Sequence, residues 1–288
     1  MNLSDQHHGD HDDHGGLHRD LRATLDRRGM LRLGARFGAA FGALQLAACG
    51  DSPTSPTPTT TTTSTTTTAT GTTTAPVAAT GTCSRIPQET EGPYPADGSN
   101  GPTVLTSSGV VRSDIRSSFA GMSGTAAGVP LNIVLNIVSV STCAPLAGAA
   151  VYLWHCDREG RYSLYNAGVT NQNYLRGIQE ADGNGRVTFQ SIYPGCYAGR
   201  WPHIHFEVYS NLAASSNSRN KTATSQIALP KATNDIAYAV AGYEQSIRNA
   251  AQITLASDNV FSDGSALELA TMTGDAASGF TATLTVAI

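Results

Sequence analysis

Several short segments of this 288-residue chain alternate apolar and polar residues with a period of two. Successive side chains of a β-strand point to opposite faces, so this alternation predicts strands that each bury one face. Many short strands with little helical periodicity predict an all-β fold, namely a β-sandwich of mixed short strands with long loops and little helix. The predicted strands cover residues 131–138, 150–156, 186–192, 203–209, 226–229 and 280–288.

Turn-forming and helix-breaking residues indicate how these strands are connected. Asp-Gly-Asn-Gly at residues 182–185 is typical of a hairpin turn. We expect the strand that follows it, residues 186–192, to pair with or lie near the strand at residues 203–209. Gly-Pro-Tyr-Pro at residues 92–95 predicts a rigid extended segment, because proline fixes its own backbone and restricts the residue before it. The mixed periodicity of residues 234–248 favours a short helix.

The strand predicted at residues 203–209 carries unusual polar chemistry. His203, His205, Glu207 and Tyr209 share one face, and the residues between them are apolar. Alternate residues of a strand lie about 7 Å apart along the backbone, a spacing that lets two imidazoles reach one ion. Two imidazoles alone do not identify the metal, since zinc, copper, iron and nickel all accept them. Two hydrogen-bonded structural histidines remain an alternative at this point.

Two tyrosines near these histidines in the sequence favour one metal over the others. Tyr197 lies six residues before His203, and Tyr162 lies in the loop after the strand at residues 150–156. Ionising a phenol near neutral pH requires a strong Lewis acid, because its ordinary pKa is about 10. Ferric iron meets this requirement, whereas zinc more often takes cysteine or carboxylate ligands.

Three motifs together resemble a known family. WHCDREGRY at residues 154–162, PGCYAGRWPHIHF at residues 194–206 and SQIALP at residues 225–230 are similar to the core of the intradiol ring-cleavage dioxygenases. The resemblance extends over roughly residues 86–288. It implies a β-sandwich that holds non-haem Fe(III) with two tyrosines and two histidines. It also implies that O2 cleaves the ring of a catechol between the two hydroxyl-bearing carbons, which gives a muconate-type product.

The resemblance implies a role for each matching residue. Tyr162 matches the equatorial tyrosinate ligand and Tyr197 the axial one, and His203 and His205 match the two histidine ligands. In this family the axial tyrosine, here Tyr197, leaves the metal and acts as a base when the catechol binds.

Two further residues match positions that act on the substrate. Arg200 matches the arginine that stabilises charge on the cleaving ring, and Gln226 matches the glutamine near the same carbon. His155 is interpreted as a structural residue. The sequence leaves open which catechol is the substrate. It also leaves open whether four aromatic residues line the substrate pocket or belong to the hydrophobic core, namely Tyr94, Trp154, Tyr165 and Trp201.

The N-terminal region predicts export. Residues 1–48 carry a twin-arginine pair, Arg27-Arg28, followed by a stretch rich in Ala, Gly, Leu and Phe. Leu-Ala-Ala before Cys49 matches a lipobox, so an acylated Cys49 is predicted as the mature N-terminus. A transmembrane helix is disfavoured, because the apolar stretch is shorter than the ~20 residues needed to span a bilayer. The sequence therefore predicts a lipoprotein of the cell envelope.

A low-complexity segment separates this signal from the rest of the chain. Residues 49–80 consist almost entirely of Thr, Ser, Pro and Ala, which predicts a disordered tether that is open to glycosylation. Residues 81–288 remain as one dioxygenase-like domain. The net charge of −4 argues against a nucleic-acid partner, and the oligomeric state is open.

Four cysteines follow Cys49 in the sequence. An even number outside the cytoplasm predicts two disulfides, for which three pairings exist. We favour Cys83–Cys143 and Cys156–Cys196, because Cys156 and Cys196 each lie near a candidate metal-ligand tyrosine.

Three functions remain in competition at this point. The first is an exported Fe(III) intradiol dioxygenase. The second is a non-catalytic extracytoplasmic lipoprotein that binds an aromatic ligand or a metal. The third is a copper or zinc site formed by His203, His205 and His155.

Overall fold

The computed structural model describes residues 83–288. The predicted signal, the acylated Cys49 and the tether lie outside these residues. Among the described helices, none has both the length and the hydropathy needed to traverse a bilayer.

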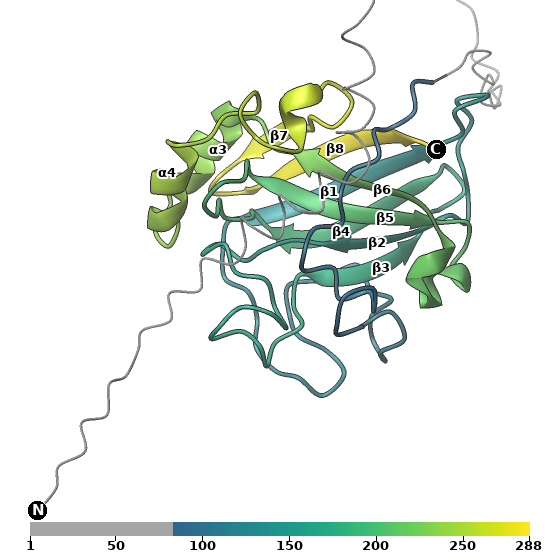
Figure 1. The fold of residues 1–288 in the computed structure, drawn as a ribbon, viewed down its shortest axis with the longest axis horizontal. Coiled ribbons are helices and arrows are strands. Elements are labelled where there is room, and N and C mark those ends of the chain that lie inside the picture. The colour runs from purple at the N-terminus through teal and green to yellow at the C-terminus, as the bar shows by residue number, and fades with distance from the viewer. Residues whose placement is uncertain (1–82) are drawn as a thin grey trace, which may run out of the picture.

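Two four-stranded sheets pack face to face (Figure 1), which confirms the prediction of an all-β sandwich. One sheet has the order β4-β1-β8-β7 and the other β3-β2-β5-β6, and every neighbouring pair is antiparallel except β1 and β8. Two short helices lie in the region where one was predicted. The elements are β1 Pro130–Val138, β2 Ala150–Trp154, β3 Arg176–Glu180, β4 Arg186–Ile192, β5 His203–Tyr209, β6 Lys221–Ala228, α3 Lys231–Tyr238, α4 Glu244–Ala250, β7 Thr271–Asp275 and β8 Gly279–Ala287.

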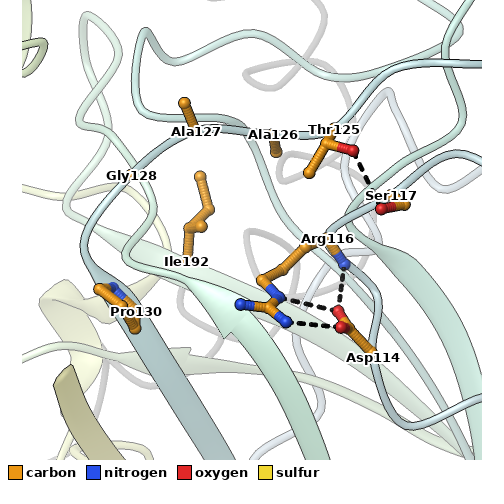
Figure 2. A pocket seen from close by; sticks show the side chains of 9 residues that line it. All are labelled: Asp114, Arg116, Ser117, Thr125, Ala126, Ala127, Gly128, Pro130 and Ile192. Atoms are coloured by element: carbon orange, nitrogen blue, oxygen red, sulfur yellow. Dashed lines mark hydrogen bonds and ion pairs between the residues drawn. The ribbon is translucent and has the colours of Figure 1, made fainter.

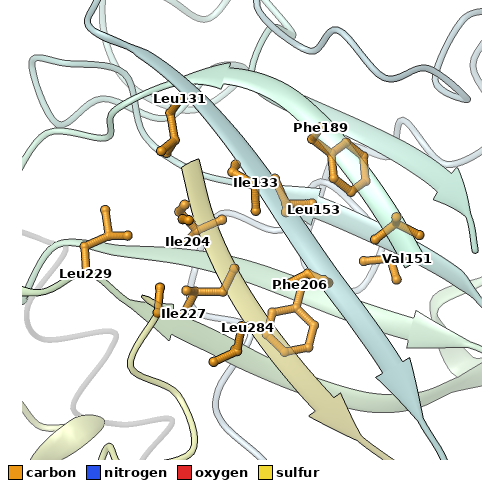
Figure 3. Close-up of a cluster of buried hydrophobic side chains, with 14 of the residues drawn as sticks. Leu131, Ile133, Val151, Leu153, Phe189, Ile204, Phe206, Ile227, Leu229 and Leu284 are labelled. Atoms are coloured by element: carbon orange, nitrogen blue, oxygen red, sulfur yellow. The ribbon is translucent and has the colours of Figure 1, made fainter. Parts of the chain in front are cut away.

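The main hydrophobic core lies between the two sheets (Figure 3), where alternate residues of each strand meet. Ile204 and Phe206 of β5 pack in the same buried cluster as Ile133 of β1 and Phe189 of β4. Each such side chain contributes about 1.5–3 kcal/mol when it is fully buried. The predicted apolar face of β5 is therefore the face that holds the two sheets together.

The outer face of the sheet β3-β2-β5-β6 is buried as well. Tyr152 and Trp154 of β2 and Tyr209 of β5 pack there against Val104 and Phe119, which come from the long segment before β1. A sheet that is covered on both faces removes its polar side chains from water. The histidines of β5 lie on this covered outer face.

The predicted pairing of residues 186–192 with residues 203–209 is wrong. β4 pairs with β1, whereas β5 pairs with β2 and β6 in the opposite sheet. The turn at residues 182–185 does form, with the N–H of Gly185 donating to the carbonyl of Asp182 at 2.9 Å. However, it carries the chain from β3 of one sheet to β4 of the other, so it does not join a hairpin. Neither β3 nor β7 was predicted.

One of the two predicted disulfides forms. Cys83 is bonded to Cys143, with their Cα atoms 5.3 Å apart, which confirms this pairing. The predicted pairing of Cys156 with Cys196 is wrong, since both are free and buried. The Sγ atom of Cys156 donates to the carbonyl of Gly195, and that of Cys196 donates to the carbonyl of Arg200, each at 3.4 Å. Burial raises the pKa of the Cys196 thiol to about 12, which keeps it protonated.

Candidate metal centre

The loop after β2 is organised by the buried carboxylate of Asp157. Its Oδ1 accepts hydrogen bonds from the backbone N–H groups of Glu159 and Arg161, both at 3.0 Å, and its Oδ2 accepts one from Tyr174 Oη at 3.1 Å. Hydrogen bonds to an ionised carboxylate are among the stronger ones, so they fix the loop backbone. The loop therefore presents Tyr162, the residue after Arg161, in one orientation within the outer-face cluster.

The loop after β4, which carries Tyr197, packs directly on this first loop. The N–H of Gly195 donates to the carbonyl of Asp157 at 3.0 Å. A Cβ atom at Gly160 would lie 3.0 Å from the Cβ of Tyr197, and Gly160 has a φ of +83°, so glycine alone fits this position without strain. This close approach brings the ring centroids of Tyr162 and Tyr197 to 5.8 Å from each other.

Strand β5 supplies the two histidines, and both lie on its outer face. The ring of His205 stacks on that of Trp154 of β2, with centroids 4.9 Å apart and an interplanar angle of 4°. The Nδ1 atom of His203 lies 2.5 Å from the carbonyl oxygen of Trp201. A carbonyl can only accept a hydrogen bond, so Nδ1 of His203 carries the proton and Nε2 carries the lone pair.

The four predicted ligands converge on one point. The Nε2 atom of His203 lies 3.1 Å from Nε2 of His205, 3.3 Å from Oη of Tyr162 and 3.4 Å from Oη of Tyr197. Atoms that bind one ion at about 2.0–2.2 Å lie about 3–3.5 Å from one another. The spacing of these atoms is therefore that of a metal site built from two loops and one strand.

Hydrogen bonding alone does not account for this arrangement. The single lone pair on Nε2 of His203 faces two phenols and an imidazole nitrogen, and it can accept from only one of them. A cation at the centre would give the lone pairs of all four donors a partner. The set of two phenol oxygens and two imidazoles fits ferric iron, which binds hard anionic oxygens and imidazole.

Burial keeps these groups neutral in the absence of a cation. It lowers the pKa of His203 well below its usual range, and the nearby positive charge of Arg200 lowers it further. Burial also lowers the pKa of His205 well below its usual range, and the neighbouring His203 lowers it further. Burial also raises the pKa of Tyr162 well above its usual range, and Tyr197 adds to the rise. The imidazoles are therefore available as neutral ligands, whereas Tyr162 needs a strong Lewis acid to ionise.

Arg200 and Gln226 lie together beside the donors, in a fixed network. Arg200 Nη2 donates to Oε1 of Gln226 at 2.6 Å, and Nε2 of Gln226 donates to the carbonyl of Thr90 at 2.9 Å. The Nε atom of Arg200 donates to Oδ2 of Asp258 at 3.0 Å, and the same oxygen accepts from the N–H of Trp201. The sequence did not indicate Asp258, which lies 58 positions after Arg200. It is the buried counter-ion of Arg200.

The four aromatic residues left open by the sequence differ in position. The ring centroid of Tyr94 lies 4.8 Å from that of Tyr162 and 5.2 Å from that of Tyr165. Tyr94 and Tyr165 therefore border the candidate metal centre. Trp154 is fully buried behind the histidines. Trp201 packs in a separate cluster, and its Nε1 donates to a backbone carbonyl.

His155 does not join the other two histidines. Its Nδ1 lies 2.7 Å from the carbonyl oxygen of Cys156, and its Nε2 lies 2.6 Å from Oγ of Ser191. Both ring nitrogens have partners away from the donors, so the structure does not support a copper or zinc site that includes His155.

A cluster of three carboxylates also lies on the outer side of this sheet. Glu207 of β5 approaches Glu91 and Asp97 closely enough for the three to share a cation. The ammonium group of Lys221 lies 2.9 Å from Oε1 of Glu207 and 3.5 Å from Oδ2 of Asp97, and it also pairs with Glu91. Burial raises the pKa of Glu207 to about 7, and Lys221 opposes the rise. The lysine supplies the positive charge that these carboxylates require.

A cleft of about 460 Å³ lies elsewhere, at the start of β1 (Figure 2). Arg116 and Asp114 form an ion pair in its wall, and the hydroxyls of Ser117 and Thr125 lie 3.0 Å apart. None of the predicted ligands lines this cleft.

Comparisons with known proteins show what this chain is similar to. The family model described as Dioxygenase matches residues 101–215, which include all four converging donors. The fold resembles that of the intradiol ring-cleavage dioxygenase from Tetranychus urticae, with 27% identity over 72% of this chain and 95% of that one and a TM-score of 0.56. Dioxygenase Tetur07g02040 is similar at 28% identity, over 72% and 94% of the two chains, with a TM-score of 0.57. No curated protein matches the sequence.

The chain is similar to dioxygenases in the central part of its sequence and in its fold. The predicted resemblance to the intradiol ring-cleavage dioxygenases is therefore confirmed. The comparisons therefore support an oxidoreductase that cleaves aromatic rings.

Proposed function

We propose that this protein is a non-haem Fe(III) dioxygenase that cleaves a catechol between its two hydroxyl-bearing carbons with O2, giving a muconate-type product. The observation that carries the proposal is the convergence of Tyr162, Tyr197, His203 and His205 at donor spacings of 3.1–3.4 Å. When bound there, ferric iron supplies the Lewis acidity that ionises phenols and activates the catechol toward O2.

The two tyrosines differ in a way that fits two roles. Tyr162 is buried and its backbone N–H is held by Oδ1 of Asn166 at 2.7 Å, so it suits a permanent ligand. Tyr197 is half-buried in a loop, and it suits a group that swings away when the catechol binds. Its Oη would hold a proton taken from the catechol.

Arg200 and Gln226 would act on the negative charge of the ring during cleavage. Both are buried, and their mutual hydrogen bond fixes them before the substrate arrives. Charged and polar groups held in advance in a dry site stabilise a developing negative charge with little reorganisation. Asp258 would keep the guanidinium of Arg200 in place.

The proposed location is the cell envelope, with the domain anchored through lipid on Cys49. The lipobox motif supports this proposal, and so does the Cys83–Cys143 disulfide, because disulfides persist mainly in oxidising compartments. Labelling cells with a fatty acid analogue should tag the protein, and Cys49→Ser should abolish the tag. A protein that remains in the cytoplasm with both thiols reduced would contradict the proposed location.

Oxygen uptake tests the proposed activity. The iron-loaded protein, supplied with a panel of catechols, should consume one O2 per catechol and form a product with muconate absorbance. Tyr197→Phe should lose most of this activity. Tyr238→Phe is the control, because it removes the hydroxyl of a tyrosine that is more deeply buried than Tyr197 and that donates to the carbonyl of Pro194, away from the donors. Binding of catechols without oxygen uptake would favour the non-catalytic alternative.

A further inference from the structure

Arg176, the first residue of β3, is buried and has no carboxylate in ion-pair range within the described part of the chain. Burying an unpaired charge is costly, so such a residue is normally retained for a purpose. Arg200 is buried to the same extent but is paired with Asp258, which makes Arg176 the exception of the two.

The hydrogen bonds of Arg176 connect three separate parts of the chain. Its Nη1 donates to the carbonyls of Tyr94 at 2.9 Å and of Pro95 at 3.0 Å, and it lies 3.3 Å from Oη of Tyr152. Its Nε and Nη2 donate to Oγ and to the carbonyl of Ser163, at 3.1 and 2.9 Å. The rigid, planar guanidinium holds these partners in one relative position.

Two of these segments carry side chains at the candidate metal centre. Ser163 directly follows the predicted ligand Tyr162, and the Tyr94 ring packs on the Tyr162 ring at 4.8 Å. The guanidinium also lies over the ring of Tyr165, 5.5 Å from its centroid, and Tyr165 Oη accepts a hydrogen bond from the N–H of Ala96 at 2.8 Å. Arg176 is therefore common to the ligand loop and to the segment that borders it.

The backbone beside these contacts is strained. Leu164, next to Ser163, has a φ of +73°, and Leu175, next to Arg176, has a φ of +58°. Bulky residues seldom adopt this left-handed region, and they do so where surrounding contacts enforce it. Both strained residues flank the same set of hydrogen bonds, which indicates that these bonds determine the local backbone.

We propose that Arg176 is a positioning residue that fixes Tyr94 relative to the ligand Tyr162, and so sets the width of the catechol site on that side. The proposal rests on the proposed function for its catechol, but the positioning itself can be measured in the metal-free protein. None of the hydrogen bonds of Arg176 goes to a predicted ligand side chain, so it positions Tyr94 and Tyr162 through the segments that carry them.

Hydrogen exchange in metal-free Arg176→Lys is the first test. Lysine keeps the positive charge but lacks the several fixed N–H donors of the planar guanidinium. Exchange should therefore rise at residues 94–100 and residues 162–166 together. Arg112→Lys is the matched control, because Arg112 is half-buried and also donates to carbonyls, those of Ile115, Ser117 and Arg176, but contacts neither segment. Unchanged exchange in both segments, or a rise equal to that in Arg112→Lys, would overturn the proposal.

The iron-loaded variants provide the second test. Arg176→Lys should shift the tyrosinate absorption band and raise the KM for catechol about tenfold, with a smaller effect on kcat. Effects of this size are typical of residues that orient a metal ligand without binding the metal themselves. An unchanged band and an unchanged preference between unsubstituted and alkyl-substituted catechols would contradict the proposal. If the wild-type protein itself shows no oxygen uptake, the proposed function fails, and the exchange measurement still decides the positioning role.

A milder variant covers the case in which Arg176→Lys does not fold. Ser163→Ala removes the Oγ acceptor of Arg176 Nε, together with the hydrogen bond that Oγ donates to the carbonyl of Tyr174, and leaves the bonds of Arg176 to residues 94 and 95 in place. Exchange should therefore rise at residues 162–166 with little change at residues 94–100. Wild-type exchange at residues 162–166 in a folded Ser163→Ala protein would count against the proposal.

Discussion

The buried histidines of this protein occupy two regions with opposite character. At the end of β2, each ring nitrogen of His155 has a hydrogen-bond partner, so the side chain is accounted for by the protein alone. On the outer face of β5, the Nε2 atoms of His203 and His205 point toward each other and toward two phenols. Burial is equal in the two regions. What distinguishes the candidate metal site is therefore the convergence of four donor atoms on one point, where hydrogen bonds among them cannot satisfy every lone pair.

The largest effect should follow from removing one of the converging imidazoles. His205→Ala should lose bound iron and reduce oxygen uptake by far more than the about 100-fold typical of residues that only orient a ligand. His155→Gln should retain the iron, because that imidazole lies outside the donor set. Elemental analysis of the purified proteins checks both statements, and iron retained at wild-type stoichiometry in His205→Ala would break the comparison.

The next effect concerns the buried ion pair beside the donors. Arg200→Met should lower kcat by about 100-fold or more, because the variant loses a fixed positive charge at the reacting ring. It also leaves Asp258 buried without a counter-ion, which costs about 3–5 kcal/mol of stability. Adding Asp258→Asn should recover much of the stability but none of the activity. Recovery of kcat in the double variant would show that Arg200 acts only on the fold.

Lys221 forms a second network of ion pairs, which, unlike that of Arg200, should affect stability alone. Lys221→Met leaves Glu91, Asp97 and Glu207 without their shared cation, so the free energy of unfolding should fall by about 3 kcal/mol. Iron content should not change. Lys231→Met is the control, because the pair of Lys231 with Asp235 is exposed and contributes less than about 1 kcal/mol. Denaturant unfolding measures both, and equal losses in the two variants would contradict this role of Lys221.

The smallest predicted effect is a pH dependence. Burial lowers the pKa of His155 to about 4, from 6.5 in the unfolded chain, so the unfolded state binds more protons between these values. The stability due to neutral His155 is therefore complete above pH 6.5 and is lost as the pH falls toward 4. The loss should reach about 2 kcal/mol at pH 5. The difference between the free energies of unfolding of the wild type and of His155→Gln, measured against pH, isolates the contribution of His155. An identical pH dependence in the two proteins would refute the prediction.

The sequence predicted those parts of the molecule that depend on local pattern. The alternation of apolar and polar residues located β1, β4, β5 and β8. The sequence motifs selected the four residues whose donor atoms the structure brings together. Their roles as ligands stay a prediction. Strand pairing was not predictable in the same way, because a turn such as residues 182–185 has the same sequence whether it joins a hairpin or crosses between sheets.

The residues that escaped prediction are those whose partners lie far along the chain. Asp258 is 58 positions from Arg200, and Arg176 is 82 positions from Tyr94, so no local pattern links them. The cysteine error has a similar origin. Proximity of Cys156 and Cys196 to candidate ligands in the sequence did not reveal that each thiol faces a backbone carbonyl.

The absorption spectrum of the iron-loaded protein tests the central claim most directly, namely that Tyr162, Tyr197, His203 and His205 hold one ferric ion. The account predicts a visible tyrosinate-to-Fe(III) charge-transfer band that changes in Tyr162→Phe and in Tyr197→Phe and shifts when catechol is added. A colourless protein that binds zinc in preference, or a band that survives both substitutions unchanged, would contradict it.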